Sequence, residues 1–401
     1  MTSRHPSRLG MGAVLIAVLL AGCGSSHHGG DAGSTRATSS TTSSTTVATT
    51  TTVATTTTAA PTTTTLPASW SEHKLLAQLI MVGGVYSDLA ASTAAAHDGA
   101  GGLVFLGQPP AGSGPALAAG LSALERTASV PLFMATDEEG GEIARLSNLV
   151  GPLPWPRQMT SEWTPAEVTT HLAAVASAMR RLGMTMDLAP VLDTASSSDT
   201  IDDENLRSFS EAGSTAAAYG LAFMKGLSDG GIISVVKHFP GLGHANGDTD
   251  LGPAEDPPLA DLVGHDLVPF QRAIDAGVRV VMMSNVTEPD WGAAPASVNP
   301  ASYRYLRGMG FSGVVLTDSL DAGAISATGL DGAQAVVKAI EAGADMAMVT
   351  TASDFPAALA GLQAAVSSGA LSMAQVVKSV DRIVAAKDAM LPARDAVVPP
   401  R

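Results

Sequence analysis

Short apolar runs alternate with longer amphipathic stretches from about residue 70 onward. Short runs bounded by turn residues are typical of buried strands, and the stretches between them have the periodicity of helices. Predicted strands span residues 79–85, 102–106, 132–136, 185–188, 232–236, 278–284, 313–317 and 345–349. Predicted helices span residues 115–128, 165–182, 210–227, 259–276, 332–342, 355–367 and 373–390.

This alternation predicts an α/β fold of parallel strands joined by helical crossovers. Eight strand–helix units fit a (β/α)8 TIM-type barrel, which we expect as a single catalytic domain over residues 68–391, followed by a tail at 392–401. A doubly wound sheet produces the same alternation. However, no Gly-x-Gly-x-x-Gly motif follows the first strand, which disfavours a dinucleotide-binding fold.

The N-terminal segment has the pattern of a secretory signal. Arg4 and Arg8 precede the apolar residues 11–20, a segment too short to predict a membrane span. The following Leu-Ala-Gly-Cys sequence resembles a bacterial lipoprotein box, which predicts a signal peptide over residues 1–23 and lipidation of Cys23. An ordinary signal peptide with an incidental cysteine is the alternative. We expect an extracytoplasmic protein that contacts the bacterial cell membrane through this lipid anchor alone.

Residues 24–67 consist mostly of Ser, Thr and Ala, which predicts a disordered tether between the anchor and the barrel. The chain of 401 residues carries a formal net charge of −15. Such a surface repels nucleic acids and anionic lipid headgroups. A single cysteine excludes an internal disulfide. We expect a monomer without a nucleic-acid partner.

Ionisable side chains cluster where the predicted strands end. In a barrel of parallel strands these positions face one shared mouth. They hold Asp137, Glu138, Glu139, Asp187, Asp193, Lys237, His238, Asn285 and Asp318. Many carboxylates with a few cations suit a polyhydroxylated substrate and acid–base chemistry. A structural ion network at the mouth is the alternative.

Several of these positions belong to segments that resemble a known family. Residues 237–243 read Lys-His-Phe-Pro-Gly-Leu-Gly, 137–141 read Asp-Glu-Glu-Gly-Gly, and 316–320 read Leu-Thr-Asp-Ser-Leu. With residues 187–193 and 205–210 they are similar, in order and spacing, to family 3 glycoside hydrolases of the single-domain β-N-acetylhexosaminidase branch. The resemblance covers about residues 70–391. It implies a retaining exo-enzyme that removes terminal N-acetylglucosamine-type residues, for which we expect peptidoglycan fragments as substrate.

The resemblance also implies roles for individual residues. Asp318 matches the nucleophile that forms a glycosyl-enzyme. The matching substrate-binding positions are Asp137, Arg145, Arg207, Lys237 and His238. Lys237 is also expected to favour the ionised form of Asp318 through its positive charge.

Three positions depart from the family pattern. Leu242 replaces a His, Glu142 replaces an Arg, and Asp250 stands where the branch has its acid/base His. Asp250 could act as the acid/base itself, because two close carboxyls such as Asp248 and Asp250 do not both ionise readily. Alternatively His244 replaces the missing imidazole. As a third alternative, proton donation is lost and a weakened homologue that binds cell-wall sugars remains.

A metal site is a separate hypothesis. His238, His244, Asp248 and Asp250 carry atoms that can ligate a divalent cation. A sugar site accounts for the same residues, so we expect neither a metal nor a cofactor in the reaction.

Overall fold

The computed structural model describes residues 70–195 and 206–389. The predicted signal peptide with Cys23, the tether and the C-terminal tail lie outside these residues. Within the described part of the chain, no helix is both long enough and apolar enough to cross a membrane.

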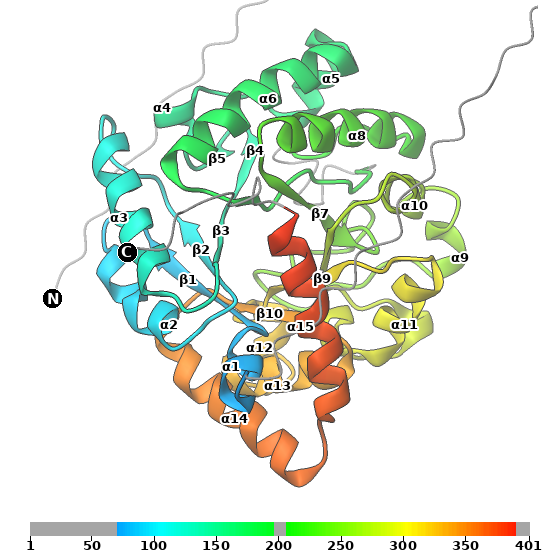
Figure 1. Cartoon of the computed structure of the whole chain (residues 1–401). Coiled ribbons are helices and arrows are strands. Elements are labelled where there is room, and N and C mark those ends of the chain that lie inside the picture. Colours follow the sequence, from blue (N-terminus) through cyan, green and yellow to red (C-terminus); the bar gives the residue numbers. More distant parts are fainter. Residues whose placement is uncertain (1–69, 196–205, 390–401) are drawn as a thin grey trace, which may run out of the picture. The chain divides into compact units, whose positions relative to one another are not determined.

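Eight parallel strands close into a barrel, surrounded by helices, which confirms the predicted fold class (Figure 1). Neighbouring strands in the barrel are successive barrel strands along the chain, as in a (β/α)8 fold. The strands are β1 (Ile80–Val85), β2 (Gly102–Leu106), β3 (Phe133–Thr136), β6 (Met186–Asp187), β7 (Ile233–Phe239), β8 (Val280–Met283), β9 (Val314–Ser319) and β10 (Met346–Val349).

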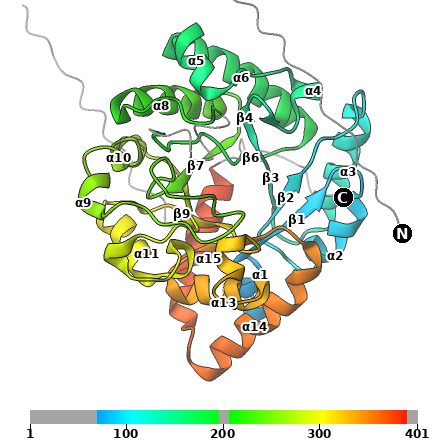
Figure 2. The same ribbon diagram turned by 180° about the vertical axis from the view of Figure 1, so that it is seen from behind.

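The longer helices pack around the barrel. They are α3 (Gly114–Thr127), α5 (Pro156–Glu162), α6 (Pro165–Leu182), α8 (Gly213–Asp229), α10 (Leu267–Asp275), α11 (Pro300–Gly308), α13 (Gly332–Ala342), α14 (Phe355–Ser368) and α15 (Met373–Asp388). Helix α15 and the short α1 (Glu72–Ala77) lie across the end where the strands begin (Figure 1). The opposite end, where the strands finish, faces the viewer in Figure 2. The base is therefore closed, and the mouth is left to the loops.

Local signals explain where α6 begins and ends. Thr164 and Glu167 form a reciprocal capping box, and Pro165 occupies the first helical turn, where its missing N–H has no intrahelical partner to lose. Gly183 ends the helix in the left-handed conformation at φ 102°. Helix α6 therefore has the predicted bounds.

The predicted helix over residues 259–276 is wrong as a single element. It is divided into α9 (Leu259–Leu262) and α10 (Leu267–Asp275), with residues 263–266 in a turn between them. Pro269 has no N–H and cannot donate to the carbonyl of His265, which prevents a continuous helix through this point. The turn brings His265 and Asp266 against the loop that follows β7, since Asp266 bonds His244.

Two features at the mouth differ from the sequence prediction. A hairpin of β4 (Glu138–Gly140) and β5 (Ile143–Ala144) follows β3 directly. Strands β7 and β9 also extend further than predicted, so that Lys237, His238 and Asp318 lie within the strands and not beyond them. The predicted strands stopped at the last apolar residue, whereas the backbone hydrogen bonds of the sheet continue through these polar residues.

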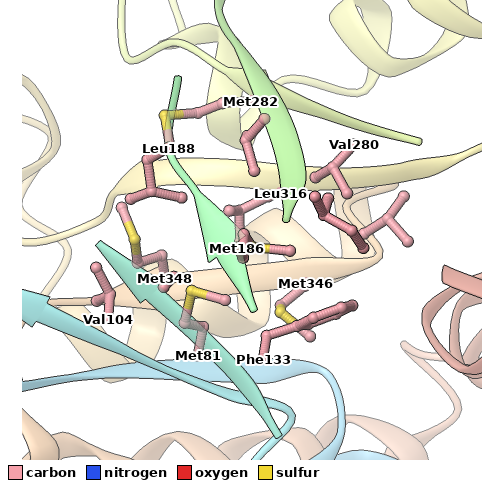
Figure 3. Close-up of a cluster of buried hydrophobic side chains, with 14 of the residues drawn as sticks. Met81, Val104, Phe133, Met186, Leu188, Val280, Met282, Leu316, Met346 and Met348 are labelled. Carbon is pink, nitrogen blue, oxygen red and sulfur yellow. The ribbon is translucent and has the colours of Figure 1, made fainter. Parts of the chain in front are cut away.

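The barrel interior is filled by layers of apolar side chains, many of them Met (Figure 3). Val104, Leu188, Met282 and Met348 come from, or directly follow, β2, β6, β8 and β10, which are alternate strands. Four side chains from alternate strands form one layer in this fold. These four also line the cavity at the mouth, so the top of the core is the floor of the site.

Candidate active site

A cavity of about 310 Å³ lies at the ends of the strands. This volume is at the small end of the range of about 300–1,000 Å³ for small-molecule sites. Nine ionisable residues singled out from the sequence line it together: Asp137, Glu139, Arg145, Arg207, Lys237, His238, Asp248, Asp250 and Asp318. The structure therefore joins segments that are far apart in the sequence into one polar wall above the apolar floor.

Other residues at the ends of the strands do not line the cavity. Glu138, Asp187, Asp193 and Asn285 are fully buried behind its wall, where they bond neighbouring loops. Asn285, for example, donates to the Ser319 carbonyl over 2.6 Å. These residues support the loops that form the cavity wall, and they are not in a position to contact a molecule bound in the cavity.

Glu139 is the centre of a buried ion network. The sequence pattern placed this residue at the mouth but assigned it no role. Arg207 binds it in bidentate fashion, with Nε and Nη2 each 2.9 Å from a carboxylate oxygen. Lys237 Nζ lies 2.6 Å from Glu139 Oε1 and 2.8 Å from Asp137 Oδ1. Burial alone would raise the pKa of Glu139, but the charges of Arg207 and Lys237 hold it well below its ordinary range. The predicted substrate-binding cations are thus held rigidly by carboxylates.

Arg145 has a different environment from the other two cations. The β4–β5 hairpin carries it into the cavity wall, and its backbone N–H donates to the Asp137 carbonyl over 3.0 Å. Its Nε is buried, without a hydrogen-bond partner among the described residues. A buried donor without a partner is costly, and a ligand in the cavity could accept from it.

A pair of carboxyl groups lies beneath the hairpin. The Glu138 N–H donates to Asp187 Oδ1 over 2.8 Å, and the Leu146 N–H donates to Glu138 Oε2 over 2.6 Å. Glu138 Oε1 and Asp187 Oδ2 have no partner in the described residues. Burial raises the pKa of Glu138 to about 9 and that of Asp187 to about 8. A neutral Glu138 has nearly the shape of Gln.

His238 is oriented by a buried carboxylate. Asp193 Oδ2 lies 2.6 Å from His238 Nδ1, while Oδ1 accepts the backbone N–H groups of His238 and Leu242 over 3.0 and 2.9 Å. Lys237 and His238 are consecutive, are joined by a cis peptide bond and both line the cavity. Asp193 thereby fixes both the imidazole and the start of the following loop.

Asp318 lies at the end of β9, where its Oδ1 accepts the Ser319 N–H over 2.7 Å. Burial raises its pKa, and the negative charge of Asp250 raises it further. Two cations oppose this effect, and His238 lowers the pKa of Asp318 more than Lys237 does. Lys237 therefore favours the ionised form of Asp318 in the expected direction, but less than His238 does, and its closest partners are Asp137 and Glu139.

Asp250 lies at the exposed rim of the cavity, on the loop after β7. Its N–H donates to Asp248 Oδ1 over 2.9 Å, and its carbonyl accepts the Gly323 N–H over 2.9 Å. A Cβ on Gly323 would lie only 2.5 Å from the Leu251 carbonyl carbon, so glycine permits this close approach. Partial burial and then the charge of Asp248 raise the pKa of Asp250.

His244 is not among the residues that line the cavity. Its Nδ1 lies 2.8 Å from Asp266 Oδ1. It therefore does not replace the imidazole that the family pattern leads one to expect near Asp250, and we do not retain it as a candidate acid/base. No local pattern indicated Asp266 as its partner, because residues 259–276 were predicted as one helix without the turn that carries Asp266.

Residues 73–386 match the profile of the Glycosyl hydrolase family 3 N terminal domain. This chain belongs to glycosyl hydrolase family 3. It is therefore a glycoside hydrolase, and the cavity at the mouth is the candidate active site of a family 3 barrel.

Individual relatives agree over most of the chain. The Beta-hexosaminidase LpqI of Mycobacterium tuberculosis is 35% identical over 336 residues, which cover 79% of this chain and 82% of that protein. The crystal structure of a family 3 glycosyl hydrolase from Mycobacterium smegmatis is 34% identical, with a TM-score of 0.73, covering 79% of this chain and 97% of the other. The Beta-N-acetylhexosaminidase from Beutenbergia cavernae is 28% identical, with a TM-score of 0.73, covering 80% and 100%.

Proposed function

We propose that this family 3 barrel is a retaining exo-β-N-acetylhexosaminidase that forms a glycosyl-enzyme on Asp318. The names of its relatives support the sugar class, because LpqI is a Beta-hexosaminidase and the Beutenbergia cavernae protein a Beta-N-acetylhexosaminidase. The small cavity supports exo-action, since it favours one terminal ring over a long stretch of polysaccharide.

In this proposal the polar wall binds the ring and the floor excludes water beneath it. Asp137, Lys237 and Arg207 are held in place by the Glu139 network and present preorganised groups to sugar hydroxyls. Arg145 uses its free donors for the same purpose, and His238 is fixed by Asp193. Rigid hydrogen-bonding groups hold the anomeric carbon in reach of Asp318.

The observation that carries the proposal is that Asp250 and Asp318 line the same cavity, where the charge of Asp250 raises the pKa of Asp318. A retaining mechanism needs one carboxyl group that keeps a proton while the other is ionised. Asp318, next to His238, is the better placed to be the anion and attack the anomeric carbon. Asp250, next to Asp248, protonates the leaving oxygen and then deprotonates the attacking water.

Release of aryl alcohol from an aryl β-N-acetylglucosaminide tests the nucleophile. Asp318→Asn is expected to abolish release, while Asp261→Asn, a control at an exposed position outside the cavity, keeps the native rate. If the native protein binds N-acetylglucosamine but releases no aryl alcohol, it is the weakened binding homologue and the proposal fails.

A comparison of leaving groups tests the acid. Asp250→Asn is expected to slow cleavage of an N-acetylglucosamine disaccharide by about 10²–10⁴, because an alkoxide needs a proton to leave. A nitrophenyl glycoside needs less help, so its bond cleavage slows less. Equal slowing of both substrates would show that Asp250 does not supply the proton.

We further propose that the substrate is a peptidoglycan fragment and that the barrel is held at the outer face of a bacterial membrane. The Leu-Ala-Gly-Cys sequence ending at Cys23, followed by the Ser/Thr-rich segment 24–67, supports a lipid anchor with a long tether. Cys23→Ala is expected to shift the protein from the membrane fraction to the soluble fraction. Unchanged membrane association would contradict the anchor.

A further inference from the structure

A cluster of two imidazoles and one carboxylate lies outside the cavity. His244 comes from the loop after β7, and His265 and Asp266 come from the turn between α9 and α10. One ligand atom from each of these residues lies within 4.8 Å of the others. Imidazole nitrogens with a carboxylate oxygen are a donor set that suits Zn²⁺ better than Ca²⁺ or Mg²⁺.

The distances within this cluster are close to those of a tetrahedral site. His244 Nδ1 lies 2.8 Å from Asp266 Oδ1, and His265 Nδ1 lies 3.7 Å from Asp266 Oδ2. Ligands about 2.0–2.1 Å from a tetrahedral zinc ion are roughly 3.3 Å apart. These two distances differ from that value by about 0.5 and 0.4 Å, and all three ligand atoms lie within 4.8 Å of one another, so side-chain adjustments that draw the two imidazoles together would admit the ion.

A second carboxylate near the cluster is buried without a partner. Both side-chain oxygens of Asp256 lack a hydrogen bond among the described residues, although the side chain is 3% exposed. Burial raises its pKa, and the nearby charges of Asp266, Asp193 and Glu288 raise it further. Buried carboxyl groups thus gather beside two imidazoles, and a divalent cation at this place would favour their ionised forms and reduce the repulsion between them.

The cluster also joins three segments of the mouth. Thr194, next to Asp193 in the segment after β6, places its hydroxyl 3.0 Å from His265 Nδ1 and 2.8 Å from Asp266 Oδ1. A Cβ on Gly241 would lie 2.9 Å from Asp266 Cβ, and one on Gly243 would lie 2.3 Å from the Thr194 carbonyl. The loop after β7 is therefore pressed against the residues that follow β6 and against the start of α10.

We propose that His244, His265 and Asp266 bind a Zn²⁺-type divalent cation, with water as the fourth ligand, and that the ion fixes the loop of residues 241–256. This loop carries Asp248 and Asp250, so the ion is structural for the active site and stays outside it. The side chains of His244 and His265 are 23% and 40% exposed, which gives the ion a path from solvent. The inference does not depend on the substrate or on the roles of Asp250 and Asp318.

Metal content of the untagged full chain tests the site. After equilibration with Zn²⁺ and dialysis, the native protein is expected to retain one more zinc ion per chain than His265→Gln. Because the His265 side chain is partly exposed, we expect His265→Gln to fold like the native protein. His73→Gln, at an exposed position of α1, is the matched control and should retain as much zinc as the native protein. His27 and His28 are common to all three proteins and cancel in the comparison.

Amide hydrogen exchange tests the effect on the loop. Zn²⁺ is expected to slow exchange within residues 241–256 in the native protein and in His73→Gln, but not in His265→Gln. Equal zinc content in the native protein and His265→Gln overturns the site. Unchanged exchange in a zinc-loaded native protein overturns its structural role.

Discussion

The two ends of the barrel treat buried charge in opposite ways. At the base, Asp345 is fully buried, and each of its oxygens accepts two hydrogen bonds. The donors are Ser379 and Arg382 for Oδ1, and Arg307 and the Val315 N–H for Oδ2. At the mouth, Glu138 and Asp187 are equally buried, yet each leaves one oxygen without a partner in the described chain.

Buried carboxyl groups therefore have two different roles in this barrel. Those at the base stabilise the fold, and those at the mouth remain available for chemistry. A fully paired carboxylate joins α11, α15 and two strands, and has no capacity left to bind a ligand. Carboxyl groups with raised pKa values and free oxygens gather at functional sites, where their incomplete pairing lowers stability. The TIM fold permits this division, because conserved chemistry belongs to the loops above the strands and stability to the base.

The largest expected effect follows from Asp345→Asn at the base. The amide keeps the shape but removes the charge opposite Arg307 and Arg382, and it cannot accept four hydrogen bonds. Breaking a buried ion pair costs about 3–5 kcal/mol, and the partial exposure of both arginines favours the lower figure. Urea unfolding followed by circular dichroism measures the loss, with kcat of the remaining folded protein unchanged.

Asp229→Asn is the control for this prediction. Asp229 pairs with Lys225 on the exposed surface of α8, where the loss of an ion pair costs about 0–1 kcal/mol. If Asp345→Asn destabilises the protein no more than Asp229→Asn does, the network at the base is not stabilising and the comparison fails.

The sequence predicted the architecture better than the site because the two depend on different signals. All eight barrel strands coincide with apolar runs, since burial on both faces leaves a continuous hydrophobic pattern. The strand ends were missed where polar residues such as Lys237 remain in the ladder. Periodicity reports burial of apolar surface and does not report backbone pairing.

The site residues could be predicted as a group, but not their partners. Asp137, Lys237 and Asp318 were placed at strand ends, and closure of the barrel brings them to one cavity. The pairing of His244 with Asp266 depends on the turn before α10, and the raised pKa values of Glu138 and Asp187 depend on burial behind a hairpin. Such contacts are tertiary, so no local pattern announces them.

A smaller effect is expected from Lys387→Met in α15. Lys387 is buried, donates to Gln78 Oε1 over 2.8 Å and lies 4.9 Å from the centroid of the Phe133 ring. Burial lowers its pKa to about 7 from an ordinary value of 10.5. Between these values the unfolded chain binds the proton that the folded chain lacks, so native stability rises with pH from about 7 to 10.5.

Removing this lysine should stabilise the protein by about 2 kcal/mol at pH 7, after the loss of the bond to Gln78 is subtracted. The gain should shrink as the pH approaches 10. Thermal unfolding at pH 7, 8 and 9 measures both effects, and Lys378→Met, at an exposed position of the same helix, is the control. A gain that does not change with pH would show that packing, and not charge, is responsible.

The smallest effect at acidic pH is expected from Glu138→Gln at the mouth. Burial raises the pKa of Glu138 to about 9 from an ordinary value of 4.5. Between these values the folded chain holds the proton that the unfolded chain releases, so native stability falls as the pH rises, opposite in sign to Lys387.

Gln copies the neutral acid, so the variant should match the native protein in stability at pH 5 and in activity at pH 6 within about twofold. By pH 8 it should be more stable than the native protein by about 4 kcal/mol, roughly 1.4 kcal/mol for each pH unit above 5, because it has no proton to lose. Thermal unfolding across pH 5–8 measures this slope, with Glu142→Gln, exposed beside the same hairpin, as the control. A variant that is destabilised at pH 5 would mean that Glu138 is ionised in the native protein, and the two ends of the barrel would then differ less than their hydrogen bonds indicate.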